Sequence, residues 1–247
     1  QTNKYYAKRK TFVLTEKQAI AIKEYAQKNN TSVFTFFFSI WSAYLSKINN
    51  NCKQLCIGTT VLNRNNFQEK NTVGLFVNTV PVFIDLDWKD SFLNHLENVE
   101  TATFSTLRNQ RYNYKNALQK IKKDYQKPYD IILSYQNTRI TGPFCESIWL
   151  HNGMQLESLQ VHIEDRDNAG VLNIHYDYQT EKFTEQDIET LHNRLMTLLD
   201  DAIENPEKSH VFTILENALL LQIIFPFASI IWWANFKISF LKYSTFL

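Results

Sequence analysis

Apolar and polar residues alternate along several stretches of the chain, most clearly between residues 76 and 86. Val80, Val82, Ile84 and Leu86 occupy every second position there. Such alternation is typical of a strand with one buried face. We therefore predict strands over Leu55–Leu62 and Phe76–Leu86, with the polar segment Asn63–Thr72 as a loop between them.

A different spacing predicts two helices near the start of the chain. Thr15 and Gln18 form a capping-box pattern, which predicts a helix that ends near Asn29 and Asn30. A second helix follows over about Ser32–Ile48, and apolar residues surround it on almost every side. A helix with no polar face belongs in a protein core.

Two further helices are predicted from caps and apolar stripes. Asp90 or Ser91 caps one whose buried stripe is Leu93, Leu96, Val99, Thr103 and Leu107. Thr184 opens a capping box before a long amphipathic helix, which Pro206 stops. The inner face of this last helix carries Ile188, Leu191, Leu195, Leu198 and Ala202.

The remaining predicted elements complete a mixed pattern. They are a short helix at Lys115–Lys123, a strand at Tyr129–Gln136, and a hairpin of Leu159–Asp165 and Val171–Tyr178 that turns at residues 167–170. Because helices and strands interleave, we predict an α/β fold with a mixed sheet in a two-layer sandwich.

One strand begins with polar residues. Asn78 and Thr79 stand at its head, shortly after Gly74. A buried amide without a partner costs a few kcal/mol, so we expect this pair to be hydrogen-bonded if it is buried. The glycine is expected to allow a close approach between backbones.

Composition and charge limit the classes of function. The chain has 247 residues, a formal net charge of +1 and 14% aromatic residues, with only 5 glycines and 5 prolines. These values describe a packed globular protein, with no charge signature for nucleic acid or an anionic membrane. Three cysteines and no leading signal peptide favour a reducing, cytoplasmic location. Because the first residue is Gln1, we expect a fragment or a processed product.

Metal and nucleophile motifs are weak in this sequence. His162 and His175 would face each other across the predicted hairpin, near Glu164 and Asp177, but a pair of histidines is more typical of an exposed edge hairpin than of a metal site. We therefore predict no metal. Cys52 and Cys56 lack a second pair and are interpreted as two buried thiols. The sequence contains no GxSxG, P-loop, HExxH or dinucleotide-binding fingerprint.

The end of the chain changes character abruptly. Residues 218–234 are almost entirely apolar and barely long enough to span a bilayer, and Pro226 interrupts them. We interpret residues 217–247 as a tail of doubtful origin rather than a membrane anchor.

Several motifs, in order, resemble those of one family. Val73–Thr79 resembles the "(I/V)GxFVNT" motif of condensation domains from non-ribosomal peptide synthetases, and Ile57–Arg64 resembles the preceding "VGTPVxGR" strand. Weaker similarities follow at Asn109–Tyr114 ("HQDYPF"), Lys123–Asp130 ("RDxSRxPLFD") and Ile131–Thr138 ("VxFxxQN"). The resemblance covers about residues 5 to 216.

The resemblance implies a particular part of that domain. Residues 1–216 are similar to the C-terminal lobe, one of two chloramphenicol-acetyltransferase-like lobes that enclose the active cleft. The family's "HHxxxDG" signature belongs to the other lobe and is absent from this sequence. We therefore assign no catalytic residue to this chain, which the resemblance implies is not competent alone.

Five residues match the family motifs near the cleft: Gly74, Phe76, Asn78, Thr79 and Arg64. The resemblance implies that Asn78 lines or braces the cleft and that Arg64 pairs with the aspartate of the signature. Two structural alternatives stay open: Asn78 ties the strand to a neighbouring loop, and Arg64 is a solvated loop arginine.

The resemblance also implies a reaction and partners. A complete domain forms an amide between an acyl or peptidyl thioester and an aminoacyl group, both held on phosphopantetheine arms of carrier proteins. It binds no cofactor of its own, and its partners are carrier proteins, the missing N-terminal lobe and an adenylation domain. The alternative is a catalytically inactive relic that only binds carrier proteins. The sequence leaves open the acyl donor, the amino-acid acceptor and the stereochemical preference.

Overall fold

A computed structural model describes residues 5–87, 89–114, 116, 128–138, 149–166 and 170–207. All but Asn116 of the predicted helix at Lys115–Lys123, most of the predicted turn at residues 167–170, Cys145 and the apolar tail lie outside these residues. No helix within the described ranges has both the length and the apolar character needed to cross a membrane.

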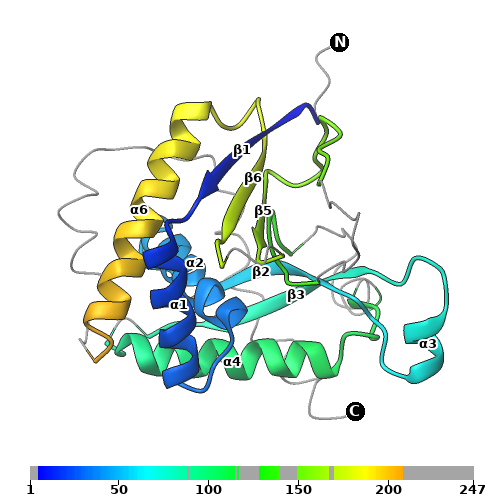
Figure 1. The fold of residues 1–247 in the computed structure, drawn as a ribbon, viewed down its shortest axis with the longest axis horizontal. Helices are drawn as coiled ribbons and strands as arrows, with labels where there is room; N and C mark the ends of the chain where they lie inside the picture. The colour runs from blue at the N-terminus through cyan, green and yellow to red at the C-terminus, as the bar shows by residue number, and fades with distance from the viewer. Residues whose placement is uncertain are drawn as a thin grey trace.

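Six strands form one twisted sheet (Figure 1). Their order across the sheet is β1-β6-β5-β4-β2-β3. They span Ala7–Val13 (β1), Gln54–Val61 (β2), Asn78–Asp85 (β3), Ile131–Gln136 (β4), Leu159–Glu164 (β5) and Asn173–Gln179 (β6). The pairs β2–β4 and β4–β5 are parallel and the other three are antiparallel, which confirms the mixed sheet.

Four long helices share one core with the sheet. They are α1 (Glu16–Lys28), α2 (Val33–Ile48), α4 (Phe92–Arg108) and α6 (Glu185–Glu204). Alternate strand residues, such as Ile57, Leu133 and Val161, are completely buried in this core. The other face carries the intervening residues, which are mostly polar on β5 and β6 and include a small apolar cluster of Cys56, Tyr129 and Ile132 near β2 and β4. The predicted two-layer sandwich is confirmed.

Helix α2 lies at the centre of the helical layer, as its all-round apolar pattern predicts. It is buried without interruption from Thr35 to Ser46. Two of its buried serine hydroxyls are satisfied within the helix: Ser39 donates to the Thr35 carbonyl at 2.9 Å, and Ser42 donates to the Ser39 carbonyl at 3.0 Å. Buried hydroxyls can therefore stay within the helix at little cost.

The predicted caps are confirmed. Thr15 and Gln18 form the capping box of α1, and Ser91 accepts the Asn94 N–H to begin α4. Thr184 and Asp187 form the box of α6. Each cap satisfies amide donors that the first helical turn leaves without partners.

Three local predictions were wrong. Strand β1 was missed, because its run of Lys8, Arg9 and Lys10 hides the alternation that marks a strand. The predicted loop Asn63–Thr72 contains a short helix, α3 (Phe67–Asn71), which Asn66 caps. Strand β3 begins at Asn78, two residues later than predicted.

The predicted edge hairpin is not at an edge. Strands β5 and β6 pair with His162 opposite His175, as the sequence predicts, but β6 also pairs with β1 along its other side. Both histidines are buried as a result.

The backbone of Gly58 on β2 lies close to the side chains of Tyr129 and Ile132. A Cβ atom there would lie 2.6 Å from a ring carbon of Tyr129 and 3.1 Å from a side-chain atom of Ile132. The glycine leaves the space that this aromatic ring fills.

We predict that Gly58→Ala lowers the free energy of unfolding by about 1–3 kcal/mol, because the added methyl group overpacks the site. Urea unfolding measures the change. In the double variant Gly58→Ala/Tyr129→Leu the loss should be smaller than the sum of the two single losses. Strict additivity would contradict the proposed contact.

His95 on α4 is a second position at which a small change should alter stability, here through protonation of its ring. Its Nε2 lies 2.8 Å from the Ser42 hydroxyl and 3.2 Å from the Ser39 carbonyl oxygen, and the ring is buried. Burial lowers the pKa of His95 to about 4. Burial also lowers the pKa of His192 on α6 to about 4.

Because both pKa values are depressed by folding, the unfolded chain takes up protons first as the pH falls. The contribution of these two histidines to the free energy of unfolding is fully present above about pH 6.5 and declines toward pH 4. His95 alone accounts for about 2 kcal/mol of the decline over this range. Urea unfolding across this range should show the decline, and His95→Gln should make it less steep. An unchanged slope in the variant would refute the assignment to His95.

Candidate functional site

The residues that match family motifs lie on or beside one connection. Residues 62–77 join β2 to β3 and are called the β2–β3 arm here. The arm extends away from the sheet and carries α3 at its far end (Figure 1). It contains Arg64, Gly74 and Phe76, and it ends at Asn78 and Thr79.

Arg64 holds the arm together from within. Its guanidinium donates to the carbonyl oxygens of Glu69, of Thr72 at 2.6 Å, and of Gly74 at 2.8 Å. The same group lies over the Phe76 ring, with 4.1 Å between the guanidinium carbon and the ring centroid. A planar guanidinium can make these contacts together, whereas an ammonium group cannot.

Neither expectation for Arg64 describes this arrangement. The residue is only half-exposed, and it binds carbonyl groups on the arm rather than a carboxylate or open solvent. Its pairing with an aspartate of the other lobe stays a prediction.

Asn78 and Thr79 begin β3 opposite Val61 and Thr60 of β2. Asn78 is exposed and Thr79 is half-buried, and the Asn78 Oδ1 accepts the Thr79 N–H at 2.9 Å. The structural alternative was that Asn78 ties the strand to a neighbouring loop. The bond found here instead joins Asn78 to the next residue of the same strand. Asn78 lies at the base of the arm, and its role in a cleft stays a prediction.

Gly74 does not serve a close approach between backbones. A Cβ atom at this position would meet only the Phe76 ring, at an ordinary contact distance of 3.5 Å. The close approach that the sequence analysis assigned to Gly74 is found instead at Gly58.

The arm presents apolar side chains to solvent. Phe67 is 81% exposed and Leu75 is 90% exposed. Leu62, Val73 and Val77 are also exposed. A concentration of exposed apolar residues on an internally braced segment is typical of an interaction surface. In the sequence this surface is visible as several apolar residues within an otherwise polar connection.

The segment that follows α4 supports the arm from one side. Arg111 forms an ion pair with Glu69, and Gln110 donates to the Asn65 side chain at 3.4 Å. The hydrogen bond from Arg111 lowers the pKa of Glu69, which also accepts the Asn65 backbone N–H at 2.8 Å. The arm is therefore fixed at both its base and its α3 end.

A second group of polar residues lies on the face of the sheet opposite α1, α2, α4 and α6. Ser134 Oγ lies 2.7 Å from His162 Nδ1, and His162 Nε2 lies 3.3 Å from Asp177. Beside this chain, Thr11 Oγ1 lies 2.8 Å from His175 Nδ1, whose Nε2 lies 2.9 Å from Glu164.

The first of these chains has the order of a catalytic triad but not its chemistry. Although burial raises the pKa of Asp177, bonds from Arg9 and His162 bring it well below its usual range. Arg9 forks onto this carboxylate at 2.6 and 2.8 Å, so the carboxylate charge is already balanced. Burial lowers the pKa of His162, and Ser134 is 2% exposed. A weak base beside a buried hydroxyl favours a structural network over nucleophilic catalysis.

Metal binding finds no support in the part of the chain that the structure describes. No group of three or more histidine, cysteine, aspartate or glutamate side chains there could hold an ion. Cys52 and Cys56 are free thiols; Cys56 is buried, as predicted, but Cys52 is only half-buried. Burial raises the pKa of both.

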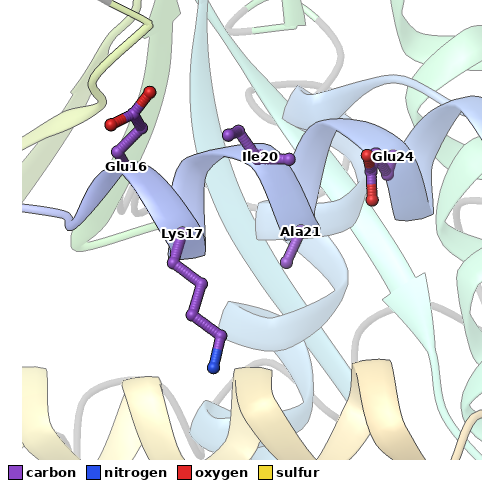
Figure 2. A pocket seen from close by; sticks show the side chains of 5 residues that line it. All are labelled: Glu16, Lys17, Ile20, Ala21 and Glu24. Atoms are coloured by element: carbon purple, nitrogen blue, oxygen red, sulfur yellow. The ribbon is translucent and has the colours of Figure 1, made fainter.

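A shallow depression lies along α1, lined by Glu16, Lys17, Ile20, Ala21 and Glu24 (Figure 2). Figure 2 shows that Glu16 and Lys17 point in opposite directions. All five residues come from one helix and they present no converging polar groups, so this depression offers no chemistry.

Comparisons with known proteins agree on one family. A family model described as "Condensation domain" matches residues 1–214. Surfactin synthase subunit 1 of Bacillus subtilis (strain 168) is 29% identical over 198 residues, which are 75% of this chain and 5% of that protein. Bacitracin synthase 1 of Bacillus licheniformis is 25% identical over 195 residues, 75% of this chain and 4% of that protein.

Solved structures show the same fold. The condensation domain from monacolin K polyketide synthase superposes with a TM-score of 0.72 at 14% identity, over 85% of this chain and 50% of that one. A four-domain nonribosomal peptide synthetase bound to AMP and glycine gives 0.73 at 18% identity, over 83% of this chain and 17% of that one. The chain thus spans a small part of its curated relatives and half of the solved condensation domain.

We predict that Arg64→Lys loosens the β2–β3 arm without unfolding the sheet, because lysine cannot contact three carbonyl groups and the Phe76 ring together. Limited proteolysis and hydrogen exchange should show faster cleavage and exchange within residues 62–77. The free energy of unfolding should change by less than about 1 kcal/mol. Arg108→Lys, at the exposed end of α4, is the matched control. Equal protection of the arm in both variants would contradict the bracing role.

Proposed function

The chain belongs to the condensation-domain family, and we propose that it forms the C-terminal lobe of an amide-forming condensation domain. Its coverage of about half of a solved condensation domain supports this assignment. The absence of "HHxxxDG" from the sequence supports it as well, because the family signature lies in the other lobe. The observation that carries the proposal is the β2–β3 arm, where the motif residues and an exposed apolar surface coincide.

The occupant we propose for the arm is the complementary lobe, whichever polypeptide supplies it. Phe67, Val73 and Leu75 would be covered by that lobe, and the base of the arm would then border the cleft. Apolar burial would supply the affinity at about 25 cal/mol per Å². The internal bonds of Arg64 would lower the ordering cost, because the arm is braced before it binds.

The proposed reaction is aminolysis of a thioester. The acceptor amine attacks the thioester carbonyl carbon, a C–N bond forms, and the C–S bond breaks. The proton lost from nitrogen ends on the departing thiolate, so no redox partner or nucleotide is consumed. Both substrates are tethered to carrier proteins through phosphopantetheine arms, and holding them together would supply most of the acceleration.

Within this chain, Asn78 is the side chain proposed to reach the reacting groups. Its Oδ1 is engaged with the Thr79 N–H, which leaves the amide N–H2 group able to donate outward. Such a donor could orient the thioester or the acceptor carbonyl. Thr79, Phe76 and Gly74 would shape the wall beside it. The proposed partners are carrier proteins, the complementary lobe and an adenylation domain, in the cytoplasm.

The test is an amide-formation assay with loaded donor and acceptor carrier proteins, run on the full chain with and without a separately expressed N-terminal lobe. We expect product only when both lobes are present. Lack of product from two folded and associated lobes would overturn the catalytic proposal, and carrier-protein binding would then support the relic interpretation.

A surface substitution separates lobe docking from catalysis. Leu75→Asp should weaken association of the two lobes by at least about tenfold, since it buries a charge in an apolar contact. Ile20→Asp, on the exposed side of α1, is the control and should leave association unchanged. Equal affinity for both variants in titration calorimetry would place the interface elsewhere.

A substitution at the base of the arm tests the cleft role. Asn78→Ala should lower the rate of amide formation by about tenfold or more while lobe association stays unchanged, because a positioned donor is lost. The exposed Asn94→Ala on α4 is the control. An unchanged rate for Asn78→Ala would remove Asn78 from the cleft.

A further inference from the structure

A short loop beside the start of β1 holds an exposed Asn-Gly pair in a fixed backbone geometry. Residues 151–154 run beside the start of β1, where Ala7 N–H donates to the Gly153 carbonyl at 2.9 Å and Tyr6 bridges to Met154. Asn152 and Gly153 form the one Asn-Gly pair in the sequence. Asn152 is exposed, and Gly153 has a φ of 78°, which favours glycine.

Asn-Gly pairs are chemically special because the glycine nitrogen meets little steric hindrance. That nitrogen can attack the asparagine side-chain carbonyl to form a five-membered succinimide. Two things limit the reaction: the amide N–H must lose its proton, and negative charge develops on the carbonyl oxygen.

The loop meets both needs. The Gly153 N–H donates to His151 Nδ1 at 3.2 Å, so a base already accepts from the attacking nitrogen. The Met154 N–H donates to Asn152 Oδ1 at 3.0 Å, which polarises the carbonyl under attack. In a neutral imidazole whose Nδ1 accepts, the proton resides on Nε2. His151 Nε2 is enclosed and has no hydrogen-bond partner among the described residues.

We propose that Asn152 is a self-modification site at which His151 acts as the base for deamidation. The Gly153 nitrogen forms a bond to Asn152 Cγ while its proton passes to His151 Nδ1. The C–N bond to the side-chain nitrogen then breaks, and His151 returns the proton so that ammonia leaves. Water opens the succinimide, giving aspartate or isoaspartate at position 152. The sum is one water consumed and one ammonia released.

The modification alters the β1 end of the sheet. Both products place a carboxylate beside Tyr6 and Met154. Isoaspartate also lengthens the main chain by one atom between Asn152 and Gly153, which displaces the Gly153 carbonyl from the Ala7 N–H. The Gln155 N–H to Tyr5 carbonyl bond at 3.0 Å lies just beyond and would be strained in turn.

The test is incubation of the full chain at neutral pH, native and in urea, followed by peptide mapping. Deamidation adds about 1 Da to the peptide that contains residue 152, and isoaspartate is separated from aspartate by chromatography. We expect the native protein to react at least as fast as the denatured chain. His151→Gln should slow the native reaction by about tenfold and leave the denatured reaction unchanged.

Chemical rescue guards against a merely structural effect of the substitution. His151→Gly should react slowly, and added imidazole should restore its native rate while having no such effect on the wild-type chain. Hydrogen exchange at Ala7 should increase as isoaspartate accumulates. The proposal is overturned if the native protein reacts at least tenfold more slowly than the denatured chain. It is also overturned if His151→Gln leaves the native rate unchanged.

Discussion

The burial of α2 on all sides is the constraint on which the rest of this fold depends. An apolar helix of this length is stable in water only when other elements cover it completely. Helix α2 contacts α1, α4 and α6 as well as strands β2 and β4, so it fixes both the helical layer and its seat on the sheet. His95 of α4 bonds directly to Ser42 of α2, which adds a polar connection inside that core.

The opposite face of the sheet obeys a different rule. Over β5 and β6 its side chains are mostly polar and buried, and Trp149 lies beside them, so each must find a partner. Asp177 meets Arg9 and His162, and the Trp149 ring centroid lies 4.3 Å from that of His162. The network ties β1 to β6 and β5, and thus holds in place an edge strand whose own sequence is weakly strand-like.

The proposed function centres on the β2–β3 arm, where the chain leaves the sheet. Arg64 braces this connection through carbonyl groups of the arm itself, while the apolar side chains around it remain exposed. Stiffness and exposed apolar surface together suit a segment that completes a site with a partner lobe. The loop at residues 151–154 is independent of this role, because its chemistry comes from local backbone contacts.

The sequence by itself determined the elements whose signals are local. Periodicity and caps located α1, α2, α4 and α6, and strand patterning placed every strand except β1 and paired His162 with His175. The sequence did not determine the features that depend on contacts made only in the folded chain. Strand β1 is a strand because β6 binds it, and the two histidines are buried because of that same pairing. Asn78 is exposed because β3 begins at the rim of the sheet, and Arg64 turned inward because carbonyl groups of a folded arm surround it. These outcomes depend on which surfaces meet, and only the tertiary structure decided them.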